Sequence, residues 1–108
     1  MKTNKVVAEI SVIPLGTGST SISEYVAACI GVLDEAKGIS YRLTPMATIL
    51  EGNLKDVLEV ARKMHEVPFL KGAARAVTTL RIDDRRDKKL SMEGKVKSVQ
   101  KRKPDVRI

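Results

Sequence analysis

The chain has 108 residues, the size of a single domain built around one hydrophobic core. Apolar residues make up 43% and charged residues 31%, which excludes a disordered protein and is typical of a globular one. The net charge is +7, and most of it falls in residues 81–108, which hold eleven Lys and Arg against five Asp and Glu. We therefore expect one domain over residues 1–108, with a core at 5–82 and a basic helical segment at 83–108.

The start of the sequence and its single cysteine indicate where the protein works. Residues 1–5 run directly into a strand-like segment, with no apolar leader and no apolar run long enough to span a bilayer. Cys29 has no partner for an internal disulfide, and its apolar neighbours are typical of a small buried hydrophobe. Both features predict a cytoplasmic protein with no contact to a membrane.

The first half of the chain predicts a strand followed by a helix. Residues 5–14 are rich in β-branched side chains, and Pro14 should close this strand because it lacks a ladder donor. Helical spacing of apolar residues then predicts a helix over residues 21–37. Ser21 and Glu24 have the spacing of a capping box at its start, and Gly38 supplies a left-handed stop.

The second half predicts two short strands, a helix, a strand and a last helix. Residues 39–51 are strand-like, with a tight reversal at Thr44-Pro45-Met46. A second helix should start at Gly52-Asn53 and end before Pro68, since a proline disfavours helical backbone in the residue that precedes it. Residues 71–82 predict the last strand, and residues 91–103 predict a third helix.

This order of elements predicts an α/β (α+β) fold of the ferredoxin-like type, βαββαβ with an added C-terminal helix. Right-handed crossovers place both long helices on one face of a four-stranded antiparallel sheet and leave the other face open. Sheet-to-sheet association of two subunits would bury the apolar residues of the open face. On this face Glu9 could pair with Arg75 of the adjacent strand. The open face should carry Val7, Glu9, Ser11 and Ile13 from the first strand, and Ala73, Arg75, Val77, Thr79 and Arg81 from the last.

No segment has a catalytic or metal-binding signature, so we expect no enzyme and no metal. His65 is the only histidine, and a surface or interface role suits it better than that of a catalytic base. One His and one distant Cys do not form a zinc cluster. Gly16 and Gly18 suggest a phosphate loop only loosely, because the third glycine and the P-loop lysine are missing.

Two segments place polar side chains in strands that would otherwise be apolar. They are residues 9–16, with Glu9 and Ser11, and residues 44–52, with Thr44, Thr48 and Glu51. A carboxylate accepts hydrogen bonds and attracts cations, hydroxyls donate or accept, and a flanking methionine supplies an apolar wall for a flat ring. These segments are therefore the candidates for a ligand site.

The same segments resemble a known family. The runs Glu-Ile-Ser-Val-Ile-Pro-Leu-Gly, Ser-Ile-Ser-Glu-Tyr-Val and Tyr-Arg-Leu-Thr-Pro-Met-Ala-Thr-Ile-Leu-Glu-Gly are similar to those of small thiamine-binding proteins, over residues 6–82. The resemblance implies ferredoxin-like domains that pair through their sheets into homodimers and often homotetramers. It also implies a ligand, thiamine or its hydroxymethylpyrimidine part, and no other cofactor.

The resemblance also implies where the ligand binds. Its Thr-Pro-Met-x-Thr pattern falls on residues 44–48, with Glu-Gly at residues 51–52, and Ala47 stands where the family often has glycine. An extra methyl group there would narrow a close approach of the backbone. The scarcity of aromatic residues predicts a site near a subunit interface. The expected ligand contacts are Ser11, Thr44, Met46, Thr48 and Glu51.

Two other functions remain open at this point. The basic segment could bind nucleic acid, although the strands at 6–14 and 72–82 lack the aromatic residues on which bases stack, which makes that partner the weaker one. A purely structural assembly module would form the oligomer and bind no small ligand. The leading prediction is reversible binding of thiamine or a related pyrimidine by a homo-oligomer.

Overall fold

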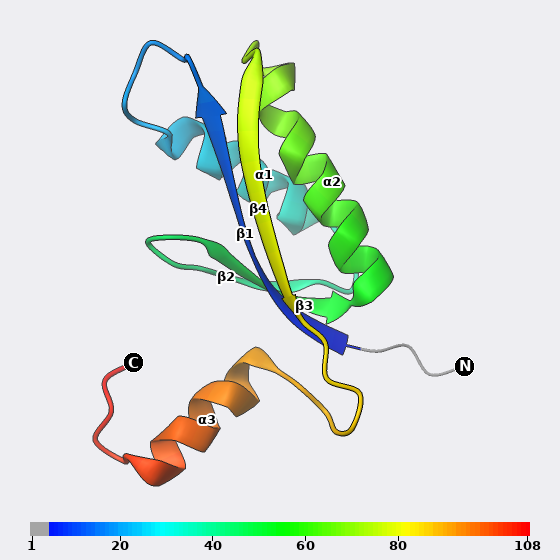
Figure 1. Ribbon diagram of the computed structural model, residues 1–108, viewed down its shortest axis with the longest axis vertical. Helices are drawn as coiled ribbons and strands as arrows, with labels where there is room; N and C mark the ends of the chain where they lie inside the picture. Colours follow the sequence, from blue (N-terminus) through cyan, green and yellow to red (C-terminus); the bar gives the residue numbers. More distant parts are fainter. Residues whose placement is uncertain (1–4) are drawn as a thin grey trace.

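The computed structural model describes residues 5–108 and confirms the ferredoxin-like fold (Figure 1). Four strands form one antiparallel sheet in the order β2-β3-β1-β4. The elements follow one another as β1 (Lys5–Leu15), α1 (Ser23–Glu35), β2 (Ser40–Leu43), β3 (Thr48–Asn53), α2 (Leu54–Leu70), β4 (Arg75–Asp83) and α3 (Met92–Arg102).

The core lies between one face of the sheet and the helices α1 and α2. Alternate residues of β1 point into it, because successive side chains of a strand face opposite ways. They meet Leu33 of α1, Leu50 of β3 and Val57 of α2, which are at most 1% exposed. Both long helices therefore cover the same face of the sheet. The β1 residues of this core are Val6, Ala8, Ile10 and Val12.

Two prolines lie inside elements that they were predicted to end. Strand β1 continues through Pro14, which pairs with Ala76 of β4. Helix α2 continues through Pro68 to Leu70, so the prediction that it ends before Pro68 is wrong. A proline at position 68 cannot donate to the carbonyl of Met64. The buried Cys29 thiol donates to that carbonyl at 3.5 Å instead, and burial raises the pKa of Cys29, which keeps the thiol protonated.

The other element boundaries differ from the predictions by a few residues. Helix α1 begins at Ser23 after Ile22, without a side-chain cap, so the predicted capping box at Ser21 and Glu24 does not form. The turn after α1 does use Gly38, which has a φ of 77°. Strand β4 starts at Arg75 because residues 71–74 form the turn after α2, where Gly72 has a φ of 95°.

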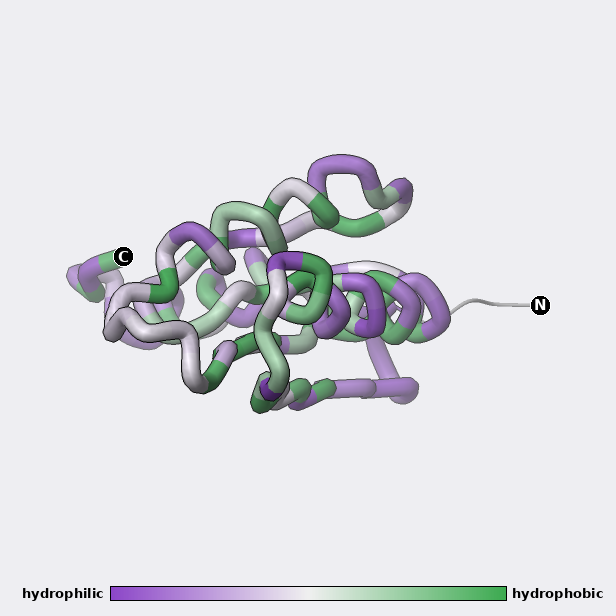
Figure 2. Tube along the Cα trace, turned by 90° about the horizontal axis from the view of Figure 1, so that it is seen from above, coloured by the Kyte–Doolittle hydropathy of each residue, from purple (hydrophilic) through white to green (hydrophobic). Residues whose placement is uncertain are grey.

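Helix α3 lies apart from the main body of the protein (Figure 1). It has no buried residue, and its start is capped by the Ser91 hydroxyl, which accepts a hydrogen bond from the Gly94 amide at 2.9 Å. The radius of gyration is 15.4 Å, above the about 13 Å expected for a compact domain of this length. In Figure 2 purple and green alternate along the helical parts of the trace, as expected for helices that each present a polar face.

The sheet face opposite α1 and α2 is open and carries apolar side chains. Ile13 and Val77 are cross-strand partners on this face and are 41% and 46% exposed. Glu9 forms an ion pair with Arg81 at 2.9 Å and not with Arg75. The register explains this correction, because Arg81 lies directly opposite Glu9 while Arg75 lies opposite Leu15 at the far end of the strands.

Candidate functional site

The candidate site lies where β1 extends beyond its neighbour β3. The pairing of these strands ends at Ile10 and Thr48, whereas β1 continues to Leu15 and pairs with β4 over its whole second half. Figure 1 shows this half of β1, in blue, with β4 beside it and the β2–β3 hairpin crossing only the other half. From residue 11 onward, no strand in the described part of the chain pairs with the edge of β1 that faces away from β4, and we call this the free edge.

A pocket of about 270 Å³ borders this free edge. Its walls come from β1, from the first half of α1, from the tip of the β2–β3 hairpin and from α2. Within the described residues 5–108 no charged side chain lines it, so a neutral ligand can bind here without the desolvation of an unpaired charge. The lining consists of residues 10–13, Ile22, Val26 and Cys29, residues 43–48, and Met64.

The pocket contains four of the five predicted ligand contacts: Ser11, Thr44, Met46 and Thr48. Met46 stands at the hairpin tip and is 87% exposed, while Thr48, the first residue of β3 directly after the tip, is 5% exposed. The structure therefore brings these four residues together in one pocket, although they come from separate strands and a turn. The sequence analysis did not single out the apolar walls that the helices contribute, Val26, Cys29 and Met64.

Thr44 shapes the hairpin tip. Its hydroxyl donates to the Ala47 carbonyl at 2.6 Å and accepts from the Ala47 amide at 3.2 Å, and its own amide donates to the same carbonyl at 2.9 Å. Ala47 lies outside the left-handed region, since among residues 5–108 only glycines have positive φ. The methyl group of Ala47 is thus accommodated without backbone strain. Thr44 holds the wall of the pocket in place.

The hydroxyl of Thr48, like that of Ser11, is a polar side-chain group in the lining of the pocket. Among residues 5–108 it has no hydrogen-bond partner, and no fully enclosed side-chain nitrogen or oxygen in that range lacks one. The Thr48 oxygen therefore borders open space, and the space beside it is the pocket. A hydroxyl both donates and accepts, so it can bind either kind of polar group on a ligand.

Glu51, the fifth predicted contact, does not line this pocket. It lies three residues after Thr48 on β3 and therefore points to the open face, opposite Val7. Its carboxylate accepts a hydrogen bond from the Met92 amide at 3.2 Å, at the start of α3. A carboxylate also suits the positive end of a helix dipole. Glu51 thus connects the sheet to α3.

Substitution Glu51→Ala is expected to loosen the contact between α3 and the sheet. It removes the acceptor of the Met92 amide, a loss comparable to that of a helix cap, and amide hydrogen exchange in α3 should become roughly tenfold faster. The matched control is Glu9→Ala, which removes another carboxylate of the open face that pairs with Arg81. Equal exchange in α3 for both variants would contradict the role of Glu51.

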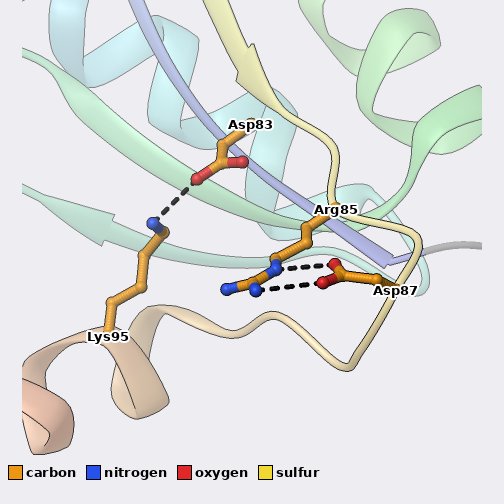
Figure 3. A network of polar contacts seen from close by, with 4 residues as sticks. All are labelled: Asp83, Arg85, Asp87 and Lys95. Carbon is orange, nitrogen blue, oxygen red and sulfur yellow. Dashed lines mark hydrogen bonds and ion pairs between the residues drawn. The ribbon is translucent and has the colours of Figure 1, made fainter.

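The segment between β4 and α3 is rich in ion pairs (Figure 3). Arg85 donates to Asp87 through two nitrogens, at 2.6 and 3.0 Å, and Lys95 of α3 reaches Asp83 at 2.7 Å. Hydrogen bonding to Arg85 lowers the pKa of the Asp87 carboxyl. Several cations of the basic segment are therefore engaged with neighbouring carboxylates, which reduces the charge available for binding nucleic acid.

Other parts of the chain offer weaker sites. A larger hollow of about 740 Å³ lies between α1 and α2, but seven charged side chains line it and it contains none of the predicted contacts.

The His65 ring nitrogen Nδ1 lies 2.6 Å from the Thr78 hydroxyl, where it connects α2 to β4. Within residues 5–108 no three His, Cys, Asp or Glu side chains gather as a metal site would require. Over the same range, no helix has the length and apolar character needed to cross a bilayer.

The fold and topology define a ferredoxin-like α/β protein, and comparison with known proteins adds its family. Residues 8–100 match the family described as thiamine-binding protein. The chain belongs to this family, and the similarity to small thiamine-binding proteins seen in its sequence is confirmed.

Individual relatives agree with this assignment. The UPF0045 protein YqgV of Bacillus subtilis is 48% identical over 98 residues, which cover 88% of this chain and 94% of that protein. A UPF0045 protein of Staphylococcus xylosus is 49% identical, covering 88% of this chain and 92% of that protein. The crystal structure of MJ1052 from Methanocaldococcus jannaschii superimposes with a TM-score of 0.81 at 38% identity, over 89% of this chain and 96% of that one.

Proposed function

We propose that this protein binds a pyrimidine ligand reversibly, either hydroxymethylpyrimidine or the pyrimidine half of thiamine, in the pocket beside the free edge of β1. The observation that carries this proposal is a pocket without charged lining residues in which, among residues 5–108, the hydroxyls of Ser11 and Thr48 have no hydrogen-bond partner. Membership of the thiamine-binding family supports the ligand class. Ser11, Thr44, Met46 and Thr48 are the proposed contacts, with Thr44 acting through the shape of the hairpin tip.

The size and polarity of the pocket favour one uncharged ring. Its volume of about 270 Å³ is at the lower end of the roughly 300–1,000 Å³ typical of drug-sized ligands. The thioethers of Met46 and Met64 supply polarizable contacts for an aromatic ring. A cationic thiazolium finds no carboxylate among the lining residues, so we place that half of thiamine at the mouth of the pocket.

In this proposal Glu51 does not contact the ligand, although the sequence analysis predicted that it would. Its carboxylate is engaged with the amide of Met92 on the opposite face of the sheet. We propose that Glu51 influences binding through the position of α3, without contact to a ligand in the pocket. The thiamine cation therefore gains no charge pairing, and the neutral hydroxymethylpyrimidine should bind at least as tightly as thiamine.

We propose binding without catalysis. The thiol of Cys29 is the strongest potential nucleophile in the pocket lining, but it donates to the Met64 carbonyl and burial raises its pKa. A protonated thiol is a poor nucleophile. The family is also named for binding.

We propose that the protein works in the cytoplasm as a homodimer that pairs through the open sheet face, and that two dimers form a homotetramer. The exposed apolar residues Ile13, Leu15 and Val77 support the dimer, because they form a continuous group on adjacent strands. In this arrangement residues 1–108 act as one domain, with a core at 5–82 and a basic segment at 83–108.

Calorimetric titration tests the ligand. The purified protein is titrated with hydroxymethylpyrimidine, with thiamine and with their phosphates. We expect heat of binding with hydroxymethylpyrimidine and with thiamine, and an affinity for the former equal to or higher than that for thiamine. The isosteric variant Thr48→Val should bind hydroxymethylpyrimidine roughly tenfold more weakly, since it loses one hydrogen bond. The absence of heat with every compound would refute the proposed function.

A further inference from the structure

The hydrogen-bonding directions of the strands show which backbone groups the free edge of β1 presents. In an antiparallel sheet, the N–H and C=O of one residue point to the same neighbouring strand, and successive residues alternate between neighbours. The Thr44 amide donates to the Ala47 carbonyl at 2.9 Å, so Ala47 points toward β2. The backbone N–H and C=O groups of residues 49 and 51 then also point to β2, and those of residues 48, 50 and 52 point to β1.

The same alternation carries over to β1 through its register. Thr48, Leu50 and Gly52 pair with Ile10, Ala8 and Val6, so the even residues of β1 point their backbone groups toward β3. Beyond Ile10 the next even residues are Val12 and Pro14, and β3 does not extend to meet them. Val12 is 7% exposed and borders the pocket.

Two further observations agree with this assignment. Prolines are tolerated in sheets where their missing donor faces away from a paired strand, which is the position that the alternation gives to Pro14. The consecutive residues 11–13 all line the pocket, although their side chains point to alternate faces. A single pocket reaches all three only where it touches the edge of the strand itself.

We infer that the backbone N–H and C=O of Val12 recognise the ligand, by pairing with an acceptor and a donor that lie side by side on one edge of a flat ring. The inference rests on the proposed function and extends it to the atoms that select the ligand. An aminopyrimidine has this edge, because its exocyclic amino group donates and the adjacent ring nitrogen accepts. The ring then takes the place of the backbone that would pair with Val12 if β3 began earlier in the chain, before Thr48.

The free edge fits a ring better than an added peptide strand. Along residues 11–15 only Val12 presents both a donor and an acceptor, since Pro14 contributes a carbonyl alone. The hairpin tip at residues 44–47 bounds the space beside the free edge on one side. A peptide strand gains its affinity from a succession of backbone hydrogen bonds, and this edge offers one donor–acceptor pair.

The test follows the Val12 amide by hydrogen exchange in NMR spectra of the full-length protein, with and without saturating hydroxymethylpyrimidine. In the free protein we expect faster exchange at Val12 than at Ile10, and at least tenfold slower exchange when the ligand is bound. The amides of Ser11 and Ile13 point to β4 and serve as internal controls that stay unchanged. A second arm measures calorimetric affinity for the analogue in which hydrogen replaces the amino group, and we expect a loss of at least tenfold.

The outcomes separate the two proposals. If no compound binds, the proposed function fails and this inference with it. If hydroxymethylpyrimidine binds while exchange at Val12 is unchanged, or if the analogue without the amino group binds equally well, the backbone inference is overturned and the proposed function stands. A Val12 amide that is already as protected as Ile10 in the free protein would also overturn it, because the edge would then be paired with another copy of the chain.

Discussion

Val26→Phe is expected to abolish ligand binding, with a loss of affinity of at least a hundredfold. Val26 projects from α1 into the pocket and is half-buried, so a larger side chain can be accommodated without disrupting the core. The added ring would occupy space that the pocket of about 270 Å³ offers to the ligand. The measurement is calorimetric titration with hydroxymethylpyrimidine.

The matched control is Val32→Phe, which makes the same change on the same helix outside this pocket. We expect Val32→Phe to bind as the unmodified protein does, and both variants to show similar thermal unfolding. Undiminished binding by Val26→Phe would show that the ligand lies elsewhere. The larger hollow between α1 and α2, which Val32 borders, would then be the next candidate site. In that case Val32→Phe would be the variant that binds weakly.

The double substitution Ile13→Lys with Val77→Lys is expected to dissociate the proposed homo-oligomer into smaller assemblies. These two residues lie opposite each other on the open face, at 41% and 46% exposure. In a face-to-face dimer each lysine would be buried against apolar residues or against its symmetry mate, at a cost of several kcal/mol. Sedimentation velocity at micromolar concentration measures the outcome against the chain mass of 11.9 kDa.

The control for this experiment is the pair Leu58→Lys with Leu70→Lys, two exposed leucines of α2 on the other side of the sheet. It introduces the same charge and should leave the dimer intact. The proposed dimer is contradicted if the unmodified protein sediments as a monomer, or if the lysines on the open face leave its mass unchanged.

The fold could be predicted from the sequence because its elements have clear periodicities. Alternation in residues 5–14 and helical spacing in the two long helices fix which side chains enter the core, and the order of elements then limits the topology. The errors concern prolines and caps. The sequence gives no sign that the thiol of Cys29, 39 residues away from Pro68, donates to the carbonyl that this proline leaves without its helical partner.

The site was only partly predictable, for a reason visible in two residues of one strand. Thr48 and Glu51 are three positions apart, and an odd spacing in a strand places side chains on opposite faces. The sequence therefore contained enough information to separate them once β3 was assigned. The free edge at Val12 was different, because it depends on the register of β1 against β3 and on the length of the hairpin, which no local pattern specifies.

The most direct test is a crystal structure of the protein grown with hydroxymethylpyrimidine. The account predicts electron density for the ring in the pocket between Thr48 and the edge of β1, with the amino group directed to the Val12 carbonyl. Density for the ring in the larger hollow between α1 and α2, or on the open face beside Glu51, would contradict the account.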